Sequence, residues 1–193
     1  MIKTTAMILK ELNRYASPAD KLSRMVQKEE YIPVIKGIYE TNRFTAGYLL
    51  AGSIYGPSYL SFEFALSYHG LIPEAVYTFT SATFEKKKKK KYITPFGTFT
   101  YRDIPSQVYP YGLEIKVEGE YSYIIASPEK ALCDQLYQTK PVSNQKELIN
   151  LLFRDLRISE EELRKLNSED IDVFAGKYGN TNIKRLSNFM RRL

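Results

Sequence analysis

The stretch SPADKLSRMVQKEEYIPVIKGIYE, residues 17–40, decides the fold of the N-terminal region. It opens with Ser17-Pro18, a helix-capping residue followed by a residue that suits the first helical turn. Apolar side chains then recur at helical spacing, whereas Tyr31–Ile35 and Ile38–Glu40 are short β-prone runs. Because Lys36-Gly37 suits a tight turn between those runs, the stretch predicts a helix followed by a β-hairpin.

The residues ahead of this stretch predict another helix. Thr4–Tyr15 places Ile8 and Leu12 on one apolar stripe. Two helices followed by a small hairpin with a lysine at its tip is the order of a winged-helix unit. We assign this short unit to residues 1–44.

Residues 45–193 predict a larger domain in which strands come between two groups of helices. Gly47–Ile54 and Ser61–Tyr68 read as short helices, and Val76–Thr83 alternates like a strand. Two hairpins follow, at residues 92–102 and 113–126. Several capped helices come after them, at residues 127–137, 145–153, 168–178 and 181–192, with a further helix start at the capping box of residues 159–162. The expected fold class is therefore α+β: a short winged-helix-like unit, then a mixed antiparallel-sheet and helix domain.

Composition excludes several classes of protein. A chain of 193 residues with 44% hydrophobic residues can build a substantial core. The single cysteine, Cys133, forbids an internal disulfide, and the single histidine, His69, argues against a multi-histidine metal site. We expect no cofactor, no metal, no signal peptide and no membrane span, and therefore a cytoplasmic protein.

The net charge of +6 is unevenly distributed. Residues 1–44 carry +3, residues 86–102 carry +7 and the last thirteen residues carry +4, whereas the intervening segments are acidic. Such segregation favours a surface that faces a polyanion. A solvated basic surface without a partner is the alternative.

The candidate DNA contacts fall into two groups. Lys21, Arg24 and Lys28 share one side of the second predicted helix, and Lys36 lies at the hairpin tip, where each could contact a base edge or a phosphate. An ordinary solvated helix face is the alternative. The second group of candidate contacts consists of the four central lysines of the run Lys86–Lys91, which are Lys87, Lys88, Lys89 and Lys90. That run equally suits a strand edge on which lysines block aggregation.

One pattern points to an enzyme instead. Asp103 followed by Glu114 and Lys116 fits the loose D…E-x-K pattern of magnesium-dependent nucleases, in which carboxylates hold the metal and a lysine assists the attacking water. A charge pair on a solvent-facing strand explains Glu114 and Lys116 equally. His69 and Cys133 are expected to have structural roles, so we predict no catalytic residue and no enzymatic activity.

The sequence resembles the AbiEi antitoxin family of type IV toxin–antitoxin systems. The similar segments are spread over nearly the whole chain, at residues 20–28, 35–39, 56–61, 65–66, 69–73, 94–101 and 127–132. The resemblance implies a transcriptional autorepressor that binds double-stranded DNA at its own promoter and neutralises a nucleotidyltransferase-like toxin in phage defence. It also implies that residues 45–193 form the antitoxin or effector domain, with a dimer on DNA as one arrangement.

One departure from the family bears on function. The N-terminal unit has two predicted helices before its hairpin, where a full winged helix has three. A protein-binding antitoxin that no longer reads DNA is therefore a third interpretation, beside the DNA-binding antitoxin and the nuclease.

Overall fold

The computed structural model describes residues 1–193 and begins with a small unit of two helices and three strands. Its elements are β1 (Ile2–Thr4), α1 (Thr5–Glu11), α2 (Pro18–Gln27), β2 (Ile32–Ile35) and β3 (Ile38–Glu40). The strands pair antiparallel in the order β1-β3-β2. The two helices and the hairpin were predicted; β1 was not, and α1 ends at Glu11 rather than Tyr15.

Local chemistry explains where these elements begin and turn. The Ser17 hydroxyl accepts a hydrogen bond from the Asp20 backbone N–H at 3.5 Å, which caps α2 as predicted. Gly37 has a φ of +85°, a conformation that favours glycine, and its carbonyl accepts from the Thr5 N–H at 3.0 Å. The hairpin turn is therefore fastened to the start of α1.

The second unit opens with short helices around the first strands of a large sheet. Gly47–Leu50 is a 3₁₀ turn that leads into α3 (Ala51–Ile54), and β4 (Tyr59–Leu60), α4 (Phe62–Tyr68) and β5 (Thr78–Thr83) follow. The remaining strands are β6 (Lys90–Thr94), β7 (Gly97–Asp103), β8 (Leu113–Glu118) and β9 (Tyr121–Ala126), with a short 3₁₀ turn at Ser106–Val108.

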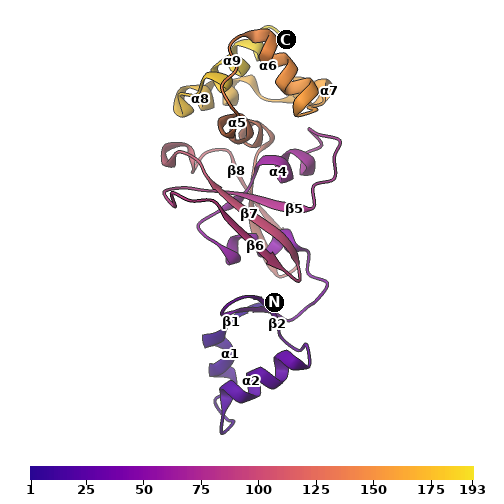
Figure 1. The fold of residues 1–193 in the computed structure, drawn as a ribbon, viewed down its shortest axis with the longest axis vertical. Helices are drawn as coiled ribbons and strands as arrows, with labels where there is room; N and C mark the ends of the chain where they lie inside the picture. The colour runs from indigo at the N-terminus through magenta and orange to yellow at the C-terminus, as the bar shows by residue number, and fades with distance from the viewer.

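Helices make up the C-terminal part of the chain. They are α5 (Pro128–Gln138), α6 (Gln145–Asn150) with a π-helical turn at Leu151–Asp155, α7 (Glu160–Lys165), α8 (Ser168–Tyr178) and α9 (Thr181–Met190). In Figure 1, α5 lies between the sheet and the other C-terminal helices, and the N-terminal unit lies at the opposite end of an elongated molecule. The fold is thus α+β, as predicted.

The large sheet is mixed, which corrects the expectation of an antiparallel sheet. Its order is β6-β7-β5-β4-β9-β8, and the pairs β4/β9 and β5/β7 are parallel. Both predicted hairpins, β6/β7 and β8/β9, are present. The first hairpin folds back so that β7 pairs with β5 and β6 becomes the edge, an arrangement that a hairpin pattern does not reveal.

The two units differ greatly in core size. A cluster of 37 buried residues fills the second unit, whereas Ile8, Leu12, Leu22 and Tyr31 form the separate core of the first. Val34 of β2 belongs to the larger cluster. The N-terminal sheet therefore packs on the second unit, and the division at residue 44 stays a prediction.

Candidate nucleic-acid interface

Helix α2 is amphipathic, and its exposed side carries basic and hydrogen-bonding side chains. Leu22 is buried in the small core, whereas Arg24 and Lys28 are exposed. Ser23 and Gln27, which the sequence analysis missed, lie on the same exposed side. Helical spacing would have found them, because residues three and four apart share a face. The exposed face thus combines two cations with two side chains that can hydrogen-bond base edges.

Lys21 lies at the flank of this face rather than at its centre. It is half-buried, and its ammonium group lies 5.1 Å from the centre of the Tyr15 ring. Tyr15, Asp20, Lys21 and Arg24 line a shallow depression of about 350 Å³ at the start of α2. The structure therefore brings Lys21 and Arg24 to one concave surface.

Ion pairing leaves an excess of free positive charge on the N-terminal unit. Of its five acidic residues, three are paired: Glu11 with Lys3, Glu29 with Arg43, and Glu40 with the α-amino group of Met1. The remaining basic residues have no ion-pair partner; they are Lys10, Arg14, Lys21, Arg24, Lys28 and Lys36. Free cations of this kind can contact phosphates without first losing an internal partner.

The hairpin tip presents one of these cations. Lys36 is exposed in the tight turn between β2 and β3, next to Gly37. The turn is fixed by the hydrogen bond from Thr5, as described above. Lys36 is thus an exposed cation on a fixed turn, in a unit whose strands lie between its two helices and the second unit (Figure 1).

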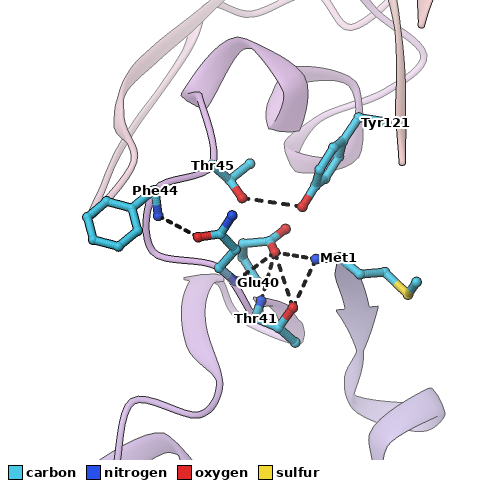
Figure 2. Close-up of polar contacts among 7 residues, drawn as sticks. Met1, Glu40, Thr41, Phe44, Thr45 and Tyr121 are labelled. Atoms are coloured by element: carbon cyan, nitrogen blue, oxygen red, sulfur yellow. Dashed lines mark hydrogen bonds and ion pairs between the residues drawn. The ribbon is translucent and has the colours of Figure 1, made fainter. Parts of the chain in front are cut away.

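Glu40 closes the base of the hairpin where the two units meet. Figure 2 shows its Oε1 atom facing the α-amino group of Met1 and the backbone N–H of Thr41, with the Thr45–Tyr121 hydroxyl contact close by. Burial raises the pKa of the Glu40 carboxyl, but hydrogen bonds from Met1, Asn42 and Thr41 outweigh burial and hold that pKa below its usual value. The ionised carboxylate therefore fixes the end of β3 to the start of β1.

The lysine run lies on the second unit, apart from α2. Lys87, Lys88 and Lys89 are exposed in the loop before β6, Lys90 begins β6, and none of the six lysines forms an ion pair. The loop is anchored, because the Asp103 carboxylate accepts from the Lys87 backbone N–H and from the Thr83 hydroxyl, both at 2.6 Å. The far end of β6 leads to Phe96, which packs against Gly47. The two groups of predicted DNA contacts therefore lie on different units of the molecule, one on α2 and the hairpin tip and the other on β6 and the loop before it.

The three residues of the nuclease pattern are not brought together. Asp103 ends β7 and Glu114 lies on β8, and three strands separate those two strands in the sheet. At about 4.8 Å per strand, that separation is roughly 19 Å. Glu114 and Lys116 form an ion pair of 2.7 Å on one side of β8, as strand alternation predicts. Both oxygens of Asp103 already accept hydrogen bonds, one from Lys87 in the lysine-run loop and the other from Thr83 at the end of β5.

The single histidine and cysteine have the structural positions expected for them. His69 follows the last residue of α4 and donates from Nε2 to the Ala126 carbonyl at 2.8 Å. Cys133 is fully buried on α5, and burial raises the pKa of its thiol. No group of three or more His, Cys, Asp or Glu side chains is arranged to hold a metal ion.

A buried polar network joins α5 to the sheet and to α8. The Lys130 ammonium donates to the Val108 carbonyl at 3.1 Å and to the Tyr178 hydroxyl at 2.6 Å, and lies 3.3 Å from Asp134. Asp134 accepts from the hydroxyls of Tyr59, Ser61 and Tyr178. Burial lowers the pKa of Lys130, and the neighbouring Asp134 carboxylate opposes that effect. Because Lys130 and Asp134 are both 0% exposed, the network is closed to solvent.

Sequence reasoning missed this network. Its spacing signal was the pair Lys130 and Asp134, which stand at i and i+4 and flank the apolar run Ala131–Cys133. The hydroxyl partners come from segments more than 40 positions away and leave no local pattern.

No family model matches the chain, and no curated protein matches it. None of the helices combines the length and the apolar character that crossing a membrane requires.

Proposed function

We propose that the N-terminal unit binds duplex DNA with α2 in the major groove and the β2–β3 turn against the backbone. The order β1-α1-α2-β2-β3 is that of a winged helix without its first helix. The observation that carries the proposal is the exposed face of α2, on which Gln27 lies beside Arg24, and Arg24 has no ion-pair partner. Arginine pairs with guanine and glutamine with adenine in the major groove.

The remaining cations have supporting roles in this proposal. Lys28 lies on the exposed face of α2 with Arg24, Lys21 lies at the flank of that face, and Lys36 lies at the wing tip. In this proposal all three contact phosphates. Lys87, Lys88, Lys89 and Lys90 attract the same polyanion without sequence preference, because exposed lysines in a loop respond to phosphate charge.

The biological role follows from the sequence resemblance. We propose a cytoplasmic antitoxin that represses its own promoter, with residues 45–193 responsible for neutralising a nucleotidyltransferase-like toxin. A gene for such a toxin adjacent to this one supports the proposal, as does rescue of growth when both are expressed. Expression of that toxin with full toxicity in the presence of this protein contradicts it.

A binding experiment tests the DNA proposal. Fluorescence anisotropy would compare the region upstream of the gene with a shuffled duplex of equal length, at several salt concentrations. We expect affinity to fall with salt by about 0.9 log units per log unit for each phosphate neutralised. Arg24→Ala should weaken binding to the upstream region by about 10- to 100-fold, as loss of a bidentate base contact does.

A matched charge control separates base reading from general attraction. Arg192→Ala removes the same charge from the opposite end of the molecule and should leave the preference for the upstream region unchanged. Equal binding of both duplexes, unaffected by Arg24→Ala, contradicts the proposal and favours an antitoxin that acts only by binding protein.

A further inference from the structure

The six-stranded sheet has two edges of opposite character. The β6 edge carries Lys90 and Lys91 and follows four further lysines, so two copies of this edge would repel each other. The β8 edge exposes apolar side chains instead: Ile115 is 73% exposed and Val117 is 76% exposed. An open edge strand with exposed apolar residues is a template for pairing with another strand.

The main chain of β8 has free hydrogen-bonding groups on its outer side. Ser127 donates to the Gly112 carbonyl at 2.8 Å, which fixes the alternation of the β8/β9 ladder. Glu114, Lys116 and Glu118 therefore direct their backbone groups towards β9. The residues between them direct their N–H and C=O groups away from the sheet; they are Leu113, Ile115 and Val117.

We propose that β8 pairs antiparallel with β8 of a second copy of this chain, with Ile115 at the two-fold axis. In this register Ile115 lies opposite Ile115 of the second copy, and Leu113 lies opposite Val117. Glu114 lies opposite Lys116 of the second copy, and Lys116 opposite Glu114, so both charges are matched twice. The outward backbone groups of all three apolar residues are then satisfied.

Charge selects this register over its neighbours. With the two-fold axis at Lys116, Lys116 lies opposite Lys116 of the second copy and Glu114 lies opposite Glu118. With the axis at Glu114, Glu114 lies opposite Glu114 of the second copy. A centre at Val117 places Glu114 opposite Glu120 and runs into the β8–β9 turn. Like charges directly opposite each other destabilise a strand pair. Only the centre at Ile115 matches every facing charge and keeps apolar residues opposite one another.

The surroundings of β8 extend the same apolar surface. Ile124 on β9 lies opposite Ile115 in the β8/β9 register and is itself exposed. It borders a depression of about 320 Å³ between β9 and the segment before β4. At the other end of β8, exposed Tyr111 and Val173 border the depression beside Leu113. Joining two copies would therefore make a continuous apolar strip from Ile124 of one chain to Ile124 of the other.

Sedimentation velocity of the full chain, with charge-reversed variants, tests this interface and its register. The wild type should sediment as a dimer of about twice the 22.4 kDa chain mass at high concentration. Glu114→Lys alone and Lys116→Glu alone should each raise the dimer Kd by at least about tenfold, because each places like charges opposite one another at two positions. A mixture of the two variants should restore dimers, and so should the chain that carries both changes.

Two controls keep the result specific. Lys91→Glu reverses a charge on the β6 edge and should leave the dimer Kd unchanged. Ile115→Pro removes an outward N–H that β9 does not use, and should abolish the dimer while circular dichroism of the folded chain is preserved.

Distinct outcomes overturn the inference. A wild-type chain that stays monomeric up to its solubility limit removes the interface. A dimer Kd that is unchanged by Glu114→Lys and Lys116→Glu contradicts the register with Ile115 at the two-fold axis. Failure of the two variants to associate when mixed contradicts it as well. These measurements need no DNA, so their failure leaves the DNA-binding proposal standing.

Discussion

The two units use their cations in opposite ways. In the N-terminal unit Arg24 is exposed and has no ion-pair partner, and only four residues form the separate core beneath it. In the second unit Lys130 is fully buried, fully hydrogen-bonded and surrounded by a core of 37 residues. A cation that serves an external partner must stay unsatisfied within the protein, whereas a buried cation must be satisfied there. The comparison predicts that replacing an exposed cation such as Arg24 changes binding, whereas replacing a member of the buried Lys130 network changes stability.

The largest expected effect is the loss of the acidic member of the buried network. Asp134→Ala leaves the Lys130 ammonium without its carboxylate and should lower the free energy of unfolding by roughly 3–5 kcal/mol, measured by urea denaturation. The double variant Lys130→Met with Asp134→Leu should be markedly more stable than Asp134→Ala, because it buries no unpaired charge. A loss below about 1 kcal/mol for Asp134→Ala would show that solvent reaches the network.

A cavity made in the small core should destabilise the N-terminal unit and leave the second unit unaffected. Ile8 is fully buried among Leu12, Leu22 and Tyr31, so Ile8→Ala should destabilise the N-terminal unit by roughly 2–5 kcal/mol. Hydrogen exchange should increase throughout residues 5–40, and DNA binding should be lost. Protection in β7 and α5 should stay as in the wild type. Equal loss of protection in both units would mean that they unfold together.

The junction between the units should be sensitive to pH. Glu40→Gln replaces a carboxylate that accepts from Met1, Thr41 and Asn42, and should cost roughly 1–3 kcal/mol at pH 7. Because folding lowers the Glu40 pKa, the stabilisation is present above its ordinary value of about 4.3 and is lost as the pH falls through the folded-state pKa. The melting temperatures of the wild type and of Glu40→Gln should therefore differ at pH 7 and converge as the pH falls below about 4. A difference that persists at low pH contradicts this role.

The smallest effect concerns the start of α2. Ser17→Ala removes the acceptor for the Asp20 N–H and should destabilise the N-terminal unit by about 1 kcal/mol. Ser17→Asp, which can still cap the helix, should retain most of that stability. If alanine and aspartate behave alike in thermal denaturation, the cap does not determine where α2 begins.

Much of the fold could be predicted because its signals are local. Ser17 and Ser127 cap α2 and α5 as the sequence indicated, and the β6/β7 and β8/β9 hairpins lie where alternating residues predicted them. The strands that were missed, β1 and β4, have three and two residues, too few to show an alternating pattern. Parallel pairing of β5 with β7 is set by packing between distant segments, which no local pattern records.

The candidate site was predictable to a similar degree. Arg24, Lys28 and Lys36 were found from charge and spacing, and the structure leaves all three exposed. The distribution of free charge could not be predicted, because it depends on ion pairs such as Glu29 with Arg43 that form only after folding. The buried network was equally hidden, because Tyr59 and Tyr178 read as ordinary core aromatics until α5 lies between them.

The buried position of Cys133 gives the molecule a built-in reporter. It carries the only thiol in the chain, and that side chain is fully buried in the native state. Cys133 lies on α5 between Lys130 and Asp134 in the sequence. A thiol-reactive dye can label it only in molecules whose α5 has transiently detached, so the labelling rate counts those opening events. Comparing the labelling rate with and without DNA would then show whether DNA bound to the N-terminal unit reduces the opening of α5 in the second unit. No additional cysteine is needed for this measurement.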